Sequence, residues 1–383
     1  MKYKLIVVSV FFCLTESLAI TWVQKSNFGG VGRHRAVGFA IGNKGYLGTG
    51  HVNGTGVDIS YKDWWMFDPA SNTWTQKANF PVNVHGAVGF GTSTRGYVGG
   101  GSSLTNEFYQ YNPVTNVWSQ IAPCPFNAGD TQGFSVQNKG YVYLTNQLAE
   151  YDPTSNTWTL KPNAPVNFGT WSCSFATSSS GFIKSGVNFY EFKPDQNTWI
   201  QRASFPGVMT NGSSAFSINE KGYVTCGYSG ALSVVTDEVW EFNPGSNSWT
   251  LIGAFPGTNR RFPVAFALNN KGYFGTGTNG INLNDFWQFD LTSLSIEEVS
   301  WDKTSIFPNP TNGEINIVLP NGFEIGFPLT IQVRSALGNL IYEGSMESTI
   351  KQFDLNRELK SGVYFISLLS KDKVVYNEKI ICY

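Results

Sequence analysis

Short apolar segments separated by glycine, proline and asparagine recur along most of the chain, which is the pattern of β-strands joined by tight turns. One arrangement repeats about six times: an apolar strand, a Lys-Gly-Tyr turn or a close variant, a variable stretch, an aromatic-rich strand that ends in a proline turn, and Asn-x-Trp. The tryptophans of this motif, at spacings of 44, 40, 41 and 50 residues, are Trp74, Trp118, Trp158, Trp199 and Trp249. A period of about 40–50 residues with four strands per copy predicts the blades of a β-propeller.

The first strand of this predicted propeller completes its last blade. The sixth copy ends near Leu294 without Asn-x-Trp, and the missing piece stands at the other end, where Ile20–Phe28 matches Asn72–Phe80. A strand added there removes an open sheet edge, which would otherwise invite aggregation. We therefore expect an all-β chain with a six-bladed propeller at residues 20–294, five blades being continuous and one split.

The copies resemble kelch repeats, which carry a glycine doublet, a nearby tyrosine and a tryptophan. Gly99-Gly100-Gly101 keeps the doublet in the second copy, whereas most other copies have Gly-x-Gly or a single glycine. The resemblance covers about residues 20–294 and implies a kelch-type β-propeller.

Residues 1–19 have the features of a secretory signal peptide. Lys2 and Lys4 precede a ten-residue apolar run that is too short to span a bilayer, and Ser17-Leu18-Ala19 is close to the small-x-small cleavage pattern. The alternative is a buried N-terminal strand. No later run reaches about 18 apolar residues, so no transmembrane span is expected.

The last part of the chain has a different pattern. After a linker at residues 295–304, strand-like runs separated by turns predict a small C-terminal β-sandwich at residues 305–383. This segment resembles the type A C-terminal sorting domain of type IX secretion cargo, on residues Pro308–Ile317, Ala336–Gly344, Leu359–Leu368 and the closing Lys379-Ile380-Ile381. The resemblance implies a Bacteroidota-type cell, engagement with the type IX secretion machinery, and transit through the periplasm to the cell surface or the exterior. It also implies removal of the domain on arrival. An ordinary accessory sandwich, with a glycan-binding role, is the alternative.

Composition and charge narrow the classes of partner. Lys and Arg number 26, Asp and Glu 27, and charged residues are only 14% of the chain while aromatic residues are 15%. This balance argues against a disordered chain and against nucleic-acid binding, which needs clustered cations. Cys124, Cys173, Cys226 and Cys382 are irregularly spaced, so we expect buried free thiols rather than a zinc or redox motif. Three histidines are too few to predict a metal site, and we expect no cofactor and a monomer.

The candidate functional site lies where loops surround the channel of the predicted propeller. Aligning the copies on their first strands gives two rings of positions at the channel mouth. The first ring is His34, His85, Gly129, Thr170, Asn211 and Arg261, and the second is Arg35, Gly86, Asp130, Trp171, Gly212 and Phe262. Arg33 and Arg260 precede the rings. The candidate ligand-binding residues are therefore Arg33, His34, Arg35, His85, Asp130, Trp171, Asn211, Arg260 and Arg261.

Several arginines with two histidines suit a carboxylate or an acidic sugar, and Trp171 offers a stacking face. Longer loops at His51–Lys62, Tyr228–Asp237 and Thr278–Asn284 would form one wall. These features favour a secreted binding module for a glycan or protein ligand. The alternative is a small-sugar enzyme similar to the kelch-type sialic acid mutarotases, which use arginine and an acid at the channel mouth; Arg33, Arg35, Arg261 and Asp130 would take those parts. Polar residues that merely line a wet channel are the third interpretation.

Overall fold

The computed structural model describes residues 18–54, 56–293, 304–319, 328–356, 358–370 and 373–383. Most of the predicted signal peptide and of the predicted linker lies outside the described residues. Backbone contacts divide the chain into two compact units, Leu18–Thr292 and a second that contains Ser293–Tyr383.

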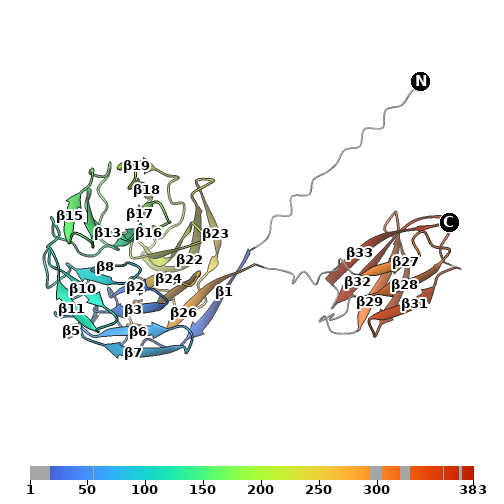
Figure 1. Ribbon diagram of the computed structural model, residues 1–383, viewed down its shortest axis with the longest axis horizontal. Helices are drawn as coiled ribbons and strands as arrows, with labels where there is room; N and C mark the ends of the chain where they lie inside the picture. Colours follow the sequence, from blue (N-terminus) through green and yellow to red (C-terminus); the bar gives the residue numbers. More distant parts are fainter. Residues whose placement is uncertain (1–17, 55, 294–303, 320–327, 357, 371–372) are drawn as a thin grey trace, which may run out of the picture. The chain divides into compact units, whose positions relative to one another are not determined.

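The first unit is a ring of six four-stranded antiparallel sheets (Figure 1), and the all-β propeller predicted from the repeats is confirmed. Blade one is β2 (Val37–Ile41), β3 (Lys44–Gly48), β6 (Trp64–Asp68) and β7 (Thr73–Lys77). Blade two is β8 (Val88–Gly91), β9 (Gly96–Gly99), β10 (Phe108–Asn112) and β11 (Val117–Gln120). Blade three is β12 (Phe134–Val136), β13 (Lys139–Leu144), β14 (Gln147–Asp152) and β15 (Thr157–Leu160).

Blade four is β16 (Cys173–Ala176), β17 (Gly181–Ser185), β18 (Asn188–Lys193) and β19 (Thr198–Gln201). Blade five is β20 (Ser214–Ile218), β21 (Lys221–Ser229), β22 (Val234–Asn243) and β23 (Ser248–Ala254). Blade six is β24 (Val264–Leu268), β25 (Lys271–Gly275), β26 (Phe286–Ser293) and β1 (Leu18–Lys25). The first strands of neighbouring blades contact one another in an unbroken circle and form the channel wall.

Each Lys-Gly-Tyr turn needs its glycine because a phenylalanine of the preceding blade lies against it. A Cβ atom built on Gly140 would stand 1.9 Å from the Phe90 ring, and one on Gly222 would stand 2.0 Å from the Phe175 ring. The same contact joins the last blade to the first, where a Cβ on Gly45 would meet Phe266 at 2.5 Å. Close packing between blades therefore explains why the motif contains glycine.

The Asn-x-Trp motif fastens each of the first five blades to the preceding blade of the ring. The Trp118 indole N–H donates to the Ala78 carbonyl at 3.0 Å, and the Asn116 side-chain oxygen accepts from the Ala78 N–H at 2.9 Å. Asn116 has a φ of 57°, a left-handed conformation that asparagine tolerates. Equivalent indole bonds from the other four tryptophans of the motif reach Ser26, Ala122, Pro162 and Ala203.

The N-terminal strand β1 lies at the outer edge of the last blade, in the order β1-β26-β25-β24, which is where the repeat alignment places it. Trp22 on β1 packs against Phe289 on β26 and Phe255, with ring-centroid distances of 5.1 and 5.0 Å. The ring is thus closed by segments from both ends of the propeller sequence.

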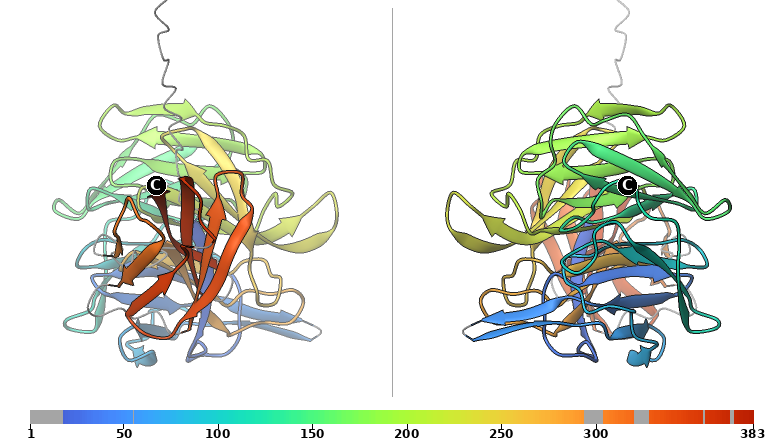
Figure 2. Two further views of the ribbon diagram at one scale, coloured as in Figure 1. Left: turned by 90° about the vertical axis from the view of Figure 1, so that its right-hand side faces the viewer. Right: turned by 90° about the vertical axis from the view of Figure 1, so that its left-hand side faces the viewer.

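Two hairpins extend the loop face of the ring. The strands β4 (His51–Gly54) and β5 (Val57–Ser60) form a separate two-stranded sheet between β3 and β6. Figure 2 shows this hairpin and the tip of the β21–β22 hairpin projecting on the same side of the propeller. The β4–β5 hairpin provides part of the wall of the candidate site.

The second unit is a two-sheet β-sandwich, as predicted. One sheet has the order β27 (Ser305–Phe307), β28 (Glu314–Val318) and β31 (Ile350–Asp354); the other is β30 (Leu340–Met346), β29 (Leu329–Ser335), β32 (Gly362–Ser370) and β33 (Lys373–Cys382). Its core contains Ile315, Ile331 and Ile366, all fully buried. Asn309 and Thr311 of the proline-rich segment hold the final strand: the Asn309 amide oxygen accepts from the Ile381 N–H, and the Thr311 N–H donates to the Ile381 carbonyl.

The four cysteines of the described residues, Cys124, Cys173, Cys226 and Cys382, are buried and unpaired, in agreement with the expectation from their spacing. Burial raises the pKa of the Cys124 and Cys226 thiols to about 12, which keeps both protonated and unreactive. Within the described ranges, no helix is long and apolar enough to cross a membrane.

Candidate functional site

Six residues form a closed ring of backbone hydrogen bonds around the channel entrance, and they are the second ring of the sequence alignment. The N–H of Gly86 donates to the Arg35 carbonyl at 2.9 Å, that of Asp130 to Gly86 at 2.7 Å, and so on through Trp171, Gly212 and Phe262. The Arg35 N–H closes the circle on the Phe262 carbonyl at 3.4 Å. We call these six residues the mouth ring.

All six residues of the mouth ring have a left-handed backbone, with φ between 53° and 66°. Only two of them are glycine. This conformation costs a non-glycine residue roughly 1–2 kcal/mol, and a bulky side chain adopts it only where the surrounding structure imposes it. Such strain concentrates at functional sites, so the four non-glycine residues of the ring mark the channel mouth as the candidate functional site.

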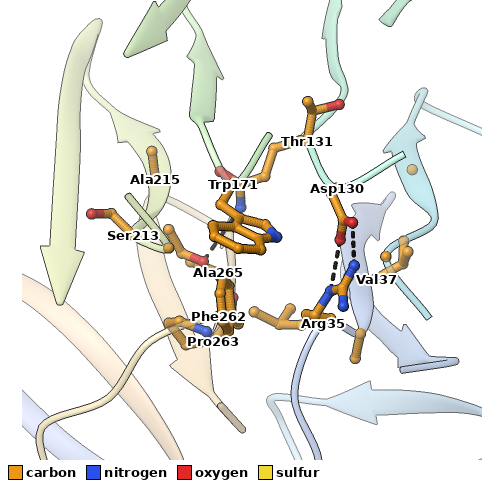
Figure 3. Close-up of a pocket in the computed structure, with 18 of the residues that line it drawn as sticks. Arg35, Val37, Asp130, Thr131, Trp171, Ser213, Ala215, Phe262, Pro263 and Ala265 are labelled. Atoms are coloured by element: carbon orange, nitrogen blue, oxygen red, sulfur yellow. Dashed lines mark hydrogen bonds and ion pairs between the residues drawn. The ribbon is translucent and has the colours of Figure 1, made fainter. Parts of the chain in front are cut away.

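Those side chains meet in two pairs over the channel (Figure 3). The Arg35 Nε donates to the Asp130 carboxylate at 2.7 Å, and a second guanidinium nitrogen completes a bidentate ion pair between blades one and three. On the other side, the Trp171 and Phe262 rings lie edge to face with centroids 5.4 Å apart. Trp171 is 40% exposed, which is unusual for a tryptophan held by its backbone in a fixed position.

The channel below the mouth ring is narrow. Its cavity of about 110 Å³ is lined by small residues of the first strands, among them Ala36, Gly89 and Ser174. The serine hydroxyls face neighbouring blades, because Ser174 donates to the Gln132 carbonyl and Ser214 to the Pro263 carbonyl. The channel interior therefore holds the blades together and offers few free polar groups.

A larger pocket of about 380 Å³ opens on the loop face, and we call it the mouth pocket. Arg35, Trp171 and Phe262 form its floor. The β4–β5 hairpin and the loop after β25 contribute its remaining walls, together with the residues preceding two of the blades. These wall residues are His34, Asn53, Gly54, Arg261, Thr278 and Gly280.

Arg261 brings an unpaired cation into the mouth pocket. Its guanidinium lies 5.2 Å from the centroid of Tyr228 and 5.3 Å from that of Phe262, and within the described residues no carboxylate or hydrogen-bond acceptor engages it. Two aromatic faces hold the planar group in place without using its N–H donors. Arg261 can therefore bind a carboxylate or a similar anion from solution.

Two predicted ligand-binding residues have a different role. Arg33 and Arg260 are fully buried, and each forms a bidentate pair with an aspartate just before the third strand of its own blade: Arg33 with Asp63, and Arg260 with Asp285. Arg33 also donates to the Thr49 carbonyl, as Arg260 does to Thr276. Assigning these two arginines to ligand contact is wrong, because their guanidinium groups are enclosed and saturated. They position the next residues, His34 and Arg261.

The sequence contained a signal for this pairing that the motif search did not use. An arginine precedes the first strand in the two blades whose third strand begins with Asp-x-Trp, at Asp63 and Asp285. In both blades the indole N–H of that tryptophan donates to the same aspartate. Burial alone would raise the pKa of Asp285, but the bonds from Arg260 and Trp287 hold it below its usual value.

All three histidines of the chain form one stack beside the mouth pocket. The ring centroids of His34 and His51 are 4.2 Å apart, and those of His51 and His85 are 3.9 Å apart. His34 Nδ1 lies 2.7 Å from the Asn282 side-chain oxygen, and His85 Nδ1 lies 2.8 Å from the Ser60 hydroxyl. We call this group the histidine stack. Among the described residues, no group of three His, Cys, Asp or Glu side chains has the geometry of a metal site.

The alignment therefore brings together part of the predicted set. Arg35, Trp171, Arg261 and His34 line the mouth pocket, and Asp130, which lines the channel cavity, pairs with Arg35. His85 belongs to the histidine stack behind it, and Asn211 exchanges backbone hydrogen bonds with Tyr228. The two rings did not include His51 and Asn53, although the His51–Lys62 loop was predicted as a wall. His51 is equivalent to Tyr228 and Thr278 of other blades, because each of the three forms a backbone bridge with a residue of the first ring.

Comparisons with known proteins agree with this architecture. Residues 305–383 match the family model of the secretion system C-terminal sorting domain. The structure is similar to the solved structure titled "Structure of YjhT", with a TM-score of 0.57 and 16% sequence identity, covering 68% of this chain and 95% of that one. A curated relative, the ulvan lyase NLR42 of Nonlabens ulvanivorans, is 30% identical over 106 residues, which are 27% of this chain and 19% of that enzyme.

The protein is thus a six-bladed β-propeller joined to a type IX secretion C-terminal sorting domain. The sorting domain implies engagement with the secretion machinery and delivery to the cell surface or the exterior. The chain spans about a fifth of the length of the ulvan lyase it matches, and the likeness to YjhT concerns the fold.

Proposed function

We propose that this protein is a secreted or surface-displayed propeller that binds an acidic glycan at the mouth pocket. The observation that carries the proposal is the unpaired guanidinium of Arg261, held between two aromatic rings at the edge of a pocket that also contains the exposed Trp171. A sugar carboxylate would pair with Arg261 through two parallel hydrogen bonds. The apolar face of the sugar ring would lie on Trp171.

The remaining groups of the pocket suit a hydroxylated ligand. Asn53 and Thr278 supply donors and acceptors at the walls, and Arg35, held in place by its bidentate pair with Asp130, supplies a fixed polar group at the floor. Because this pair is already formed, the floor does not have to reorganise when a ligand binds. Aromatic faces, polar side chains and one free cation together favour an acidic glycan over a protein ligand.

A glycan array with the mature protein tests the proposal, followed by titration of a uronic-acid oligosaccharide identified on it. Arg261→Ala should weaken binding at least tenfold, since it removes the cation without removing a structural bond. Arg95→Ala is the matched control, because Arg95 lies on the turn before β9 at the opposite end of the channel. Equal binding by the wild type and the Arg261 variant would rule out the mouth pocket as the site.

The Arg35–Asp130 pair favours a second candidate function, a small-sugar enzyme of the mutarotase or epimerase type. A carboxylate next to an arginine above a pocket can move a proton on a bound acidic sugar, once the sugar's own carboxylate has displaced Asp130 from Arg35. The test is the rate of anomer interconversion of such a sugar, followed by NMR. Acceleration by the wild type that is lost in Asp130→Asn would favour the enzyme over the binding module.

The export route belongs to the same proposal. We expect transit through the periplasm, passage across the outer membrane and removal of residues 305–383 on arrival. Expression in cells with and without the type IX machinery, with mass spectrometry of the C-terminus, tests this. A surface product that still ends at Tyr383 would contradict processing.

A further inference from the structure

The histidine stack joins the parts of the chain that build one wall of the mouth pocket. Asn282, from the loop after β25, bonds His34, and Ser60 of β5 bonds His85. Between them, the His51 ring of β4 packs against the His34 and His85 rings at interplanar angles of 53° and 52°. His34 and His51 also exchange backbone hydrogen bonds of 3.1 and 3.0 Å. The β4–β5 hairpin, which contributes Asn53 and Gly54 to the pocket, is therefore held at its base by this backbone bridge and by the contacts between the imidazole rings.

The surroundings of His51, the central ring of the stack, disfavour its charged form. His51 is 2% exposed, and its Nδ1 is buried without a hydrogen-bond partner. A protonated His51 would lie between the His34 and His85 rings in the protein interior. Like charges repel strongly there, so a charge on His51 makes protonation of either neighbouring ring less favourable. The stack is therefore stable only while its central ring is neutral.

The charged groups around the stack are unequal. Arg35 faces all three histidines and Arg261 faces His34, so two cations oppose protonation. Asp130 and Asp58 favour protonation of His85, which is the least buried of the three. His85 is therefore the first of the three to be protonated as the pH falls. Its charge then makes protonation of the other two rings less favourable.

We propose that the histidine stack is an acid-operated latch on the mouth pocket: protonation separates the three rings, releases the β4–β5 hairpin and lowers the affinity of the pocket for its ligand. The inference rests on the proposed glycan-binding function for its ligand, but the latch itself does not. At neutral pH the stack is closed and the pocket is complete. At pH 5 the separated rings move His34, Asn53 and Gly54 away from the positions in which they line the pocket.

Two readouts that need no ligand test the latch on the mature full-length protein. With only three histidines in the chain, ring NMR signals follow each titration separately. We expect His85 to titrate first, and His51 to take up its proton only together with opening of the stack. Hydrogen exchange of residues 51–60, corrected for the intrinsic effect of pH, should rise at least tenfold from pH 7 to pH 5. The β21–β22 hairpin contains no histidine and is the internal control. Unchanged protection of residues 51–60 would overturn the latch.

The variant His51→Phe keeps a flat ring in the stack but cannot take up a proton. Its 51–60 segment should stay protected at pH 5. If this variant does not fold, His85→Gln serves instead, because it removes the first proton acceptor and should reduce the pH dependence of exchange at least threefold. Wild-type pH dependence in the folded variant would overturn the proposal.

A binding measurement then separates the latch from the proposed function. The probe is a uronic-acid oligosaccharide, whose carboxylates stay ionised across this pH range. Wild-type affinity should fall at least tenfold from pH 7 to pH 5, and less than twofold in His51→Phe. No binding at any pH, with acid-induced exchange still present, would reject the glycan proposal and leave the latch standing. Binding that is independent of pH in the wild type would reject the latch alone.

Discussion

The Trp22 indole packs edge to face against the Phe289 ring at a centroid distance of 5.1 Å, although the two residues come from opposite ends of the propeller sequence. Trp22 also contacts Phe255 and Phe274, so one partly buried side chain of the N-terminal strand packs against the core of the last blade. The ring is closed by this packing together with the addition of β1 to β26. Closure should therefore be sensitive to a single truncation.

Trp22→Ala is expected to lower the free energy of unfolding by about 2–3 kcal/mol, less than the loss of a fully buried aromatic side chain, because Trp22 is only partly buried. Urea denaturation followed by circular dichroism measures the change. Val23→Ala on the same strand is the control, because Val23 is 46% exposed and should change stability by less than about 0.5 kcal/mol. Equal effects of the two substitutions would contradict the role of Trp22 in closure.

Gly222→Ala should destabilise the propeller by overpacking. The added methyl group would stand 2.0 Å from the Phe175 ring, which is itself buried between blades four and five. Forcing the ring aside costs about 1–3 kcal/mol, or more where the backbone has to move. Gly230→Ala is the matched control, since the nearest atom to its Cβ is 3.8 Å away. A thermal melt that places both variants at the wild-type midpoint would rule out this explanation of the motif.

The sequence was sufficient for the fold and for the mouth ring because both depend on a repeat. Once the first strands were aligned on residues such as Phe39 and Phe90, the equivalent positions in every blade followed, and the six residues of the mouth ring are indeed equivalent. The first strands are evenly placed around the ring because the phenylalanine of each blade packs on the glycine of the next blade.

The parts of the site that the sequence did not predict come from segments of variable length. Arg33 and Arg260 have the composition of ligand-binding residues, and only the third-strand partners Asp63 and Asp285 show that they are interior anchors. The histidine stack depends on His51, whose repeat-equivalent residues are Tyr228 and Thr278. An alignment of the residues before the first strands does not include this position, and the side chains at it differ from blade to blade. Contacts between unlike loops leave no periodic signal in a single sequence.

The Arg260–Asp285 pair should be needed for stability rather than for ligand contact. Removing one partner of a buried ion pair leaves an uncompensated charge and costs about 3–5 kcal/mol, so Arg260→Met and Asp285→Asn are each expected to be strongly destabilising. The double variant should be less destabilised than the sum of the two, because neither charge is then left alone. Denaturant unfolding of the three variants measures this coupling.

Lys44→Met provides the comparison for this cycle. The Lys44–Asp68 pair is partly exposed, and breaking it should cost no more than about 1 kcal/mol.

Because the folded-state pKa of Asp285 is below its unfolded value, the stabilisation from this carboxylate is present above the unfolded pKa and is lost as the pH falls through the folded pKa. Additive effects of Arg260→Met and Asp285→Asn would contradict the pairing.

The histidine stack should make the propeller less stable in mild acid. Burial lowers the pKa of His34 and His85, and burial with the neighbouring histidines and Arg35 lowers the pKa of His51 to about 3. The folded state therefore binds fewer protons than the unfolded state, whose histidines titrate near their model value of 6.5. It follows that the stabilisation is present above pH 6.5 and is lost as the pH falls toward the folded pKa values.

For His51 alone, lowering the pH from 6.5 to 5 should reduce the free energy of unfolding by about 2 kcal/mol. Urea unfolding at pH 7, 6 and 5 measures this loss, which should be smaller by that amount in His51→Phe; parallel pH profiles of the wild type and the variant would show that His51 takes up protons equally in the folded and unfolded chains.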